Sequence, residues 1–272
     1  MASLPDFAKP PVVEVALSVQ FEPLQGLHAA HLGLFWKGLR ARFPRTQEHP
    51  PLLPVVERFG VLAPVQPQVT FEMAPPMPRL WFVNEAETEL LQIQTNRFIH
   101  NWRKGEKGGD YPRYKLLRQK LHEELELFTA FLKTEGIGDL RANQCELTYI
   151  NQIVAGEGWQ KHGEVDKILT TWRPGYSESF LPPAEAVSVA SRYVIPGAQS
   201  EPVGRLHITV APSFRSSDSR PTLLLQLVAR GAPQGETLEA VFQFLDKSHE
   251  WAVKGFTSIT TPLMHGIWER QS

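Results

Sequence analysis

Hydrophobic and polar residues alternate strictly between Val13 and Phe21, a pattern that predicts a strand with one buried and one polar face. Apolar residues recur three and four positions apart in two longer stretches. In residues 27–43 this spacing predicts an amphipathic helix that Pro44 ends. In residues 111–134 it predicts a longer helix that stops before Gly136. The first half therefore mixes strands with amphipathic helices.

The residues between these two helices predict further strands. Residues 79–84 and the longer run 90–104 have the composition of strands, and shorter strands are expected at 55–59 and 69–73. Six prolines between residues 44 and 67 predict a long irregular connection. Not counting the edge strand at 55–59, the first half has the order β-α-β-β-β-α.

The second half repeats this order. Residues 145–153 align with residues 13–21 without a gap, and Glu146 and Gln152 match Glu14 and Gln20. A helix at 164–172, strands at 186–195, 205–214 and 222–230, and a helix at 236–256 follow, then a tail. We predict an α+β fold of two β-α-β-β-β-α halves, residues 1–138 and 139–272. Their antiparallel sheets, separate or joined into one curved sheet, carry long closing helices on one face. Coincidence is the alternative, because amphipathic elements recur in any α+β protein.

Composition limits the classes of protein that fit. Of 272 residues, 42% are hydrophobic and 21% are charged, as in ordinary folded proteins. A formal net charge of −1 argues against binding polyanions over the whole surface. Cys145, the single cysteine, cannot form an internal disulfide, which suits the cytoplasm. Without a signal-like N-terminus or an apolar run of about 18 residues, we expect a cytoplasmic protein with no membrane partner.

One segment is locally basic. Residues 97–120 hold eight Lys or Arg and two acids, a local balance of +6 (8 − 2), with aromatic residues interleaved. Cations and aromatic faces are what phosphates and stacked bases require. The predicted basic-aromatic surface consists of Arg97, Trp102, Arg103, Lys104, Lys107, Tyr111, Arg113 and Tyr114. Its partner would be a protein, a nucleic acid or both. The alternative is a solvated basic face whose aromatic residues anchor a strand to a helix.

Other motifs carry less chemistry. Glu14 and Glu146 occupy equivalent positions and could form a paired carboxylate site, or pair with arginines instead. The two histidines of His28-x-x-His31 lack a third ligand, so no metal is expected. The glycine loop at 105–109 lacks the Gly-Lys-Ser/Thr ending of a nucleotide P-loop. Cys145 lies at a buried strand position. We therefore expect no cofactor and no catalytic residue.

Three motifs carry a resemblance to a known family. They are residues 9–15 (KPPVVEV), 98–103 (FIHNWR) and 111–114 (YPRY), and the ending around His249-Glu250-Trp251 is also similar. The chain resembles, over nearly its whole length, a family of sporadically distributed, uncharacterised bacterial proteins. The resemblance implies no activity and no catalytic residues. The patchy distribution of the family implies mobile or defence-associated gene neighbourhoods.

Two functional hypotheses follow. The first is a non-catalytic binding or interaction protein, such as a homodimer or a subunit of a larger, defence-associated assembly, that uses the basic-aromatic surface. The second is a small-molecule-binding protein or an enzyme with a cavity between the sheet and the closing helices, because folds of this kind often enclose such cavities. A partly polar cavity that contains Glu14 or Glu146 would favour the second.

Overall fold

The first half of the chain forms five strands and two helices among the residues that the structure describes. The computed structural model describes residues 3–60, 77–105, 109–175 and 180–272. The elements are β1 (Val12–Phe21), α1 (Ala29–Leu39), β2 (Arg45–His49), β3 (Arg79–Val83), β4 (Glu89–Gln94), β5 (Arg97–Arg103) and α2 (Arg113–Thr134).

The second half adds four strands. Its elements are β6 (Ala142–Val154), the 3-10 turn η1 (Val165–Lys167), β7 (Val189–Pro196), β8 (Pro202–Phe214), β9 (Pro221–Gly231), α3 (Leu238–Ile259) and α4 (Pro262–Ile267). These nine strands form one open antiparallel sheet in the order β2-β3-β4-β5-β1-β6-β9-β8-β7. The α+β prediction is confirmed, and the two predicted sheets are joined into one.

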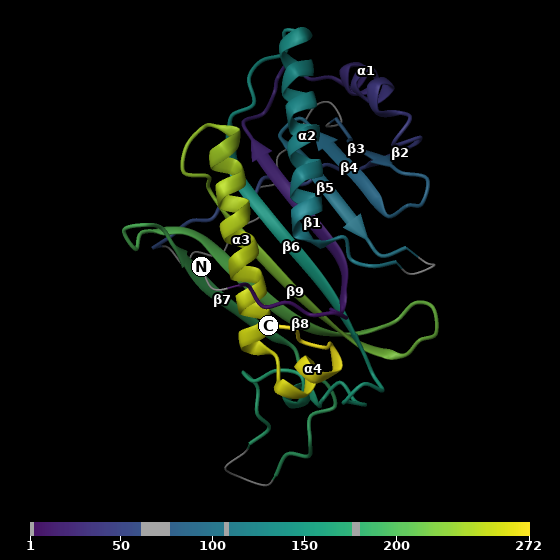
Figure 1. Cartoon of the computed structure of the whole chain (residues 1–272), viewed down its shortest axis with the longest axis vertical. Helices are drawn as coiled ribbons and strands as arrows, with labels where there is room; N and C mark the ends of the chain where they lie inside the picture. The colour runs from purple at the N-terminus through teal and green to yellow at the C-terminus, as the bar shows by residue number, and fades with distance from the viewer. Residues whose placement is uncertain (1–2, 61–76, 106–108, 176–179) are drawn as a thin grey trace.

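The strand order is symmetric about the β1–β6 pair, except that β2 adds one further edge strand to the first half. β1 and β6 are the first strands of the two halves, and they pair with each other in antiparallel register. β5 then flanks β1 as β9 flanks β6, and α2 and α3 cross the same face (Figure 1). Among the described residues, the first half has four strands after α1, whereas the second half has three strands after η1, so the duplication of a β-α-β-β-β-α unit stays a prediction.

The alternation in β1 determines which side chains the closing helices cover. Val15, Leu17 and Val19 are fully buried on the helix-covered face. The stripe of α2 that meets this core consists of Leu117, Leu121, Leu125, Phe128 and Leu132, all fully buried. Each such side chain contributes roughly 1.5–3 kcal/mol of hydrophobic stabilisation. The helix-covered face therefore holds the main core.

Both closing helices have 22 residues, but only one side of each is apolar. The polar sides carry Lys, Glu and Gln residues that face solvent. Among the described residues, no helix combines the length and the apolar character that crossing a bilayer requires.

Residues 90–104 form a hairpin and not the single strand that the sequence predicted. Gln94 of β4 pairs with Arg97 of β5, which leaves Thr95 and Asn96 as a two-residue turn. The turn contains no glycine or proline, and threonine is common in strands. Asparagine tolerates turn conformations, which explains how the chain reverses there.

Other predicted elements also differ from the structure. The strand predicted at 55–59 is absent, and β2 at residues 45–49 forms this edge of the sheet. The strand predicted at 69–73 lies outside the described residues. The helix predicted at 164–172 is reduced to η1, because Leu169 forms a bridge with Thr260 after α3. The C-terminal tail folds back through α4, and Trp268 packs against Phe256.

Candidate functional site

The structure separates the eight residues of the predicted basic-aromatic surface. Side chains alternate along β5, so Arg97 and Trp102 lie on opposite faces of the sheet. Trp102 and Tyr114 are buried under the helices (5% and 8% exposed), and Arg97 is buried on the other face. Lys104 is exposed, and Lys107 lies outside the described residues. These side chains do not form one continuous surface.

Carboxylates neutralise much of the local positive charge. Of the eight cations between residues 97 and 120, seven are described by the structure, and four of these have an acidic partner. The pairs are Arg103 with Glu87, Arg113 with Asp6, Arg118 with Asp246, and Lys120 with Glu89. Because each carboxylate already balances its cation, this segment offers less attraction to a phosphate backbone than its composition indicated.

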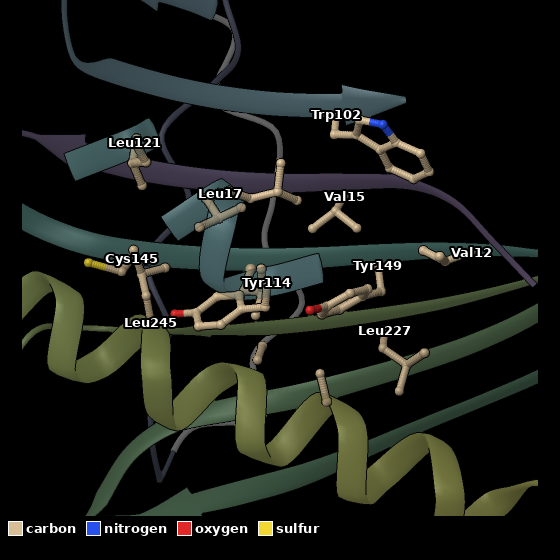
Figure 2. Close-up of a cluster of buried hydrophobic side chains, with 14 of the residues drawn as sticks. Val12, Val15, Leu17, Trp102, Tyr114, Leu121, Cys145, Tyr149, Leu227 and Leu245 are labelled. Atoms are coloured by element: carbon tan, nitrogen blue, oxygen red, sulfur yellow. The ribbon is translucent and has the colours of Figure 1, made fainter. Parts of the chain in front are cut away.

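Three residues of the predicted surface instead line a cavity between the sheet and the closing helices. They are Tyr111, Arg113 and Tyr114, and the cavity has a volume of about 380 Å³. Small-molecule sites occupy roughly 300–1,000 Å³. The sheet contributes Tyr149, Asn151 and Leu227 to the lining, and α3 contributes His249, Ala252 and Phe256. Figure 2 shows the rings of Tyr114 and Tyr149 in the layer between the sheet and α3.

A chain of hydrogen bonds crosses the cavity wall. The hydroxyl oxygens of Tyr111 and Tyr149 are 3.1 Å apart, and the Tyr149 hydroxyl is 2.9 Å from His249 Nδ1. Burial lowers the pKa of His249 to about 4, although the charge of Asp246 opposes this shift. His249 is therefore neutral near pH 7 and shares a hydrogen bond with the Tyr149 hydroxyl at Nδ1. The Tyr149 hydroxyl shares a second hydrogen bond with the Tyr111 hydroxyl.

A second network holds the same rings in place. The ring of Tyr114 stacks on that of His249, with centroids 4.0 Å apart and planes 10° apart. The Tyr114 hydroxyl donates to Asp246 Oδ1 over 2.8 Å, and Arg118 Nε donates to the same oxygen over 2.7 Å. Burial and the nearby charge of Asp246 raise the pKa of Tyr114. The network links α2 to α3 and orders the cavity before any ligand enters.

N-terminal residues close one side of the cavity. Arg113 Nη1 binds Asp6 Oδ1 over 2.8 Å, and Arg113 Nη2 donates to the carbonyl of Phe7 over 3.1 Å. Phe7 is buried and packs edge-on against Phe256, with centroids 5.5 Å apart. Arg113 adopts a φ of 69°, which costs a non-glycine residue roughly 1–3 kcal/mol. Its contacts with the N-terminal residues offset this strain.

Glu14 and Glu146 lie on the polar face of the sheet, away from the cavity. Glu146 is opposite Ser18, four residues along β1 from Glu14, so the two backbone positions are roughly 13 Å apart along the strand. The structure therefore does not bring them together as a pair. Glu14 lies opposite Arg103, and Glu146 lies opposite Arg230 and binds its Nε over 2.5 Å. The matching partners follow the symmetry of the two halves.

The remaining motifs have structural explanations. No three His, Cys, Asp or Glu side chains of the described residues are grouped as a metal site. His31 Nδ1 accepts the N–H of His28 over 3.1 Å and so caps the start of α1. Cys145 is buried, and burial raises the pKa of its thiol. Residues 106–108 of the glycine loop lie outside the described residues.

Comparisons of the chain with protein families, with curated proteins and with solved structures found no match. The resemblance to sporadically distributed bacterial proteins therefore stays a prediction.

Sequence reasoning missed half of the cavity. Asp246 and His249 contact Tyr114 of α2 from 132 and 135 positions away in the chain (246 − 114 and 249 − 114), and Tyr149 is 38 positions from Tyr111, so no local spacing connects them. One signal was present: Tyr149 lies at a core position of an alternating strand, where a hydroxyl needs a partner.

Proposed function

We propose that the chain is a non-catalytic binding protein. Its ligand is a small, largely apolar molecule with one hydrogen-bonding group, held in the cavity between the sheet, α2 and α3. The lining of the cavity supports this proposal: Val12, Leu227 and Ala252 offer apolar contacts, and the hydroxyls of Tyr111 and Tyr149 meet at one wall. Sites for small molecules combine mostly apolar walls with a few placed polar groups.

The protonation states of the cavity favour binding over catalysis. A general base works best with a pKa near the working pH. The pKa of His249 is held to about 4 by burial, so it is a weak base at neutral pH. Burial raises the pKa of Tyr111 to about 12, which keeps its hydroxyl neutral. These groups donate and accept hydrogen bonds at pH 7 without giving up or gaining charge.

A pair of aromatic probes tests the proposal. Calorimetric titration with 2-naphthol and with 2-methylnaphthalene compares ligands that differ by a hydroxyl. We expect wild-type protein to bind 2-naphthol more tightly, because only the hydroxyl reaches the tyrosines. Ala252→Trp, which fills the cavity, should abolish binding of both probes. Ala130→Trp, on the exposed side of α2, should change neither.

Two further variants separate the causes of failure. Tyr149→Phe should remove most of the preference for 2-naphthol while both probes still bind. Val253→Trp fills the cavity from a less buried position and serves if Ala252→Trp does not fold. Absence of saturable binding to the wild type would contradict the proposal. So would binding of the probes by Ala252→Trp and Val253→Trp that is as tight as binding by wild type.

A further inference from the structure

Residues 52–58, which we call the strap, lie on the polar face of the sheet and are bound there through their main chain. No backbone–backbone hydrogen bond joins the strap to another described residue. Side chains of the sheet bind its main chain instead. Gln94 binds both the N–H and the carbonyl of Leu52, each over 2.9 Å.

Two more glutamines accept N–H groups of the strap: Gln20 from Val55 over 2.9 Å, and Gln144 from Glu57 over 3.3 Å. Two arginines donate to its carbonyls: Arg97 to Leu53 over 3.0 Å, and Arg205 to Arg58 over 2.8 Å.

The strap inserts the side chain of Glu57 into a cage formed by Arg205, His207 and Arg230. The carboxylate of Glu57 binds Arg205 over 2.5 Å and His207 over 2.6 Å, and Arg230 lies 3.4 Å away. The side chain of Glu57 is 6% exposed. Burial alone would raise its pKa, but the hydrogen bonds from His207 and Arg205 outweigh that effect and lower it to about 2.

Two apolar side chains of the strap point into solvent and do not pack against the polar face. Leu53 is 81% exposed and Val56 is 55% exposed. Pro54 favours an extended chain and donates no N–H, so the strap gains no helix or strand of its own. A segment with hydrogen-bonded main-chain groups and exposed apolar side chains is bound through features that many extended peptides share.

From these contacts we infer that the polar face is a binding site for an extended, acidic segment of a partner protein. The strap occupies this site in cis, and the partner segment replaces it. Gln20, Gln94 and Gln144 each accept a main-chain N–H, a donor that nucleic-acid backbones lack. The cage of Arg205, His207 and Arg230 adds the requirement for a carboxylate. Peptide recognition of this kind takes affinity from the main chain and specificity from one side chain.

A partner segment must bind the polar face tightly enough to displace the strap. A tethered segment acts at an effective concentration of the order of millimolar, so a free peptide displaces it only weakly. A partner that also covers Leu53 and Val56 would gain the apolar area that the strap leaves in water. This inference concerns the face opposite the cavity and does not depend on the ligand proposed there.

Weakening the strap exposes the site to a probe. The probe is a fluorescein-labelled synthetic peptide with the sequence of residues 50–59, measured by anisotropy against full-length protein. Glu57→Ala removes the carboxylate that occupies the cage in wild type. This variant should therefore bind the probe at least tenfold more tightly than wild type. The same peptide with Glu57→Gln should bind the variant at least tenfold more weakly, because the cage then meets no charge.

Two controls identify the site. Arg205→Ala in the Glu57→Ala background should abolish probe binding, whereas Arg40→Ala, an exposed arginine beyond α1, should leave it unchanged. Equal probe binding by wild type and by Glu57→Ala, or indifference to Arg205→Ala, would overturn the inference.

Hydrogen exchange on the wild type keeps the inference testable if Glu57→Ala does not fold. Excess unlabelled peptide should speed exchange of the amides of Leu52, Val55 and Glu57, because displacement frees them from the glutamines. Unchanged exchange at saturating peptide would overturn the inference. Light scattering tests for a second copy of the chain as the occupant. Dimers that dissociate when the peptide is added would identify that second copy and would overturn the inference of a separate partner protein.

Discussion

The two faces of the sheet are closed in different ways, although the same strands supply both. Under α2 and α3, Leu17 and Val19 of β1 pack into an apolar core and are fully buried. On the opposite face, Ser18 and Gln20 of the same strand are nearly as hidden (5% and 4% exposed). Gln20 there bonds to Arg97 and to the strap. Close packing depends on the shapes of particular side chains, whereas the polar face depends on main-chain groups that another peptide can supply.

The comparison predicts its largest effect in the helix-covered core. Phe128 of α2 is fully buried, and its ring lies near those of Phe21, Phe35 and Phe98. Phe128→Ala should lower the free energy of unfolding by about 4 kcal/mol, because it removes this packing and leaves a cavity. Urea denaturation measures the change. A loss below about 1.5 kcal/mol would show that this core can collapse around the deletion.

A buried charge on the same face should give the next largest effect. Glu124 of α2 is fully buried and binds His100 Nδ1 over 2.8 Å and Arg42 over 2.5 Å. Glu124→Ala strands the buried His100 and should lower the free energy of unfolding by about 3 kcal/mol. Glu126→Ala, an exposed neighbour on α2, should change it by less than about 0.5 kcal/mol. Similar values for the two variants would mean that solvent reaches Glu124.

The acid stability of the polar face depends on Glu57. Its folded pKa of about 2 lies below the ordinary 4.5, so its contribution is present above pH 4.5 and is lost as pH falls toward 2. Over that range, wild type should lose about 2 kcal/mol more than Glu57→Gln, allowing for partial exposure to solvent. Denaturation at several pH values measures the difference. Glu48→Gln, on the exposed β2, should titrate like wild type.

The smallest effect should come from the bonds to the strap. Gln94→Ala removes two hydrogen bonds to Leu52 and one to Asn96, and should cost about 1–1.5 kcal/mol of unfolding free energy. Gln226→Ala, on the same face but without such a bond to the described strap, should cost less than about 0.5 kcal/mol. If Gln94→Ala matched Phe128→Ala, the two faces would not differ in the way described above.

Local patterns predicted elements well where a single face is buried. The alternation around Val15 and the helical stripe around Leu121 each repeat often enough to identify the element. The turn at Thr95-Asn96 was missed because its residues are also acceptable in a strand. The sequence predicts a strand at 55–59 because Val55 and Val56 have high strand propensity. In the structure, side chains on other strands bind the main chain of the strap instead, and it forms no strand.

Three residues of the predicted basic-aromatic surface lie at the cavity, but the surface itself is not formed. Tyr111, Arg113 and Tyr114 were selected for their charge and aromatic character, and they do line the cavity. Their proposed surface was not assembled, because alternation along β5 sends Arg97 and Trp102 to opposite faces. His249 was absent from the prediction, since nothing near it in sequence indicates contact with Tyr149.

The sequence by itself determined the α+β class and the closing helices, because strand and helix periods are local properties. It also indicated the repeated order of the two halves. Only the tertiary structure decided that β1 and β6 join the halves into one sheet, that the cavity brings Tyr111 to Tyr149, and that Glu57 meets two arginines and a histidine. Those contacts span many residues, and their geometry depends on how helices and strands pack, which no local spacing encodes.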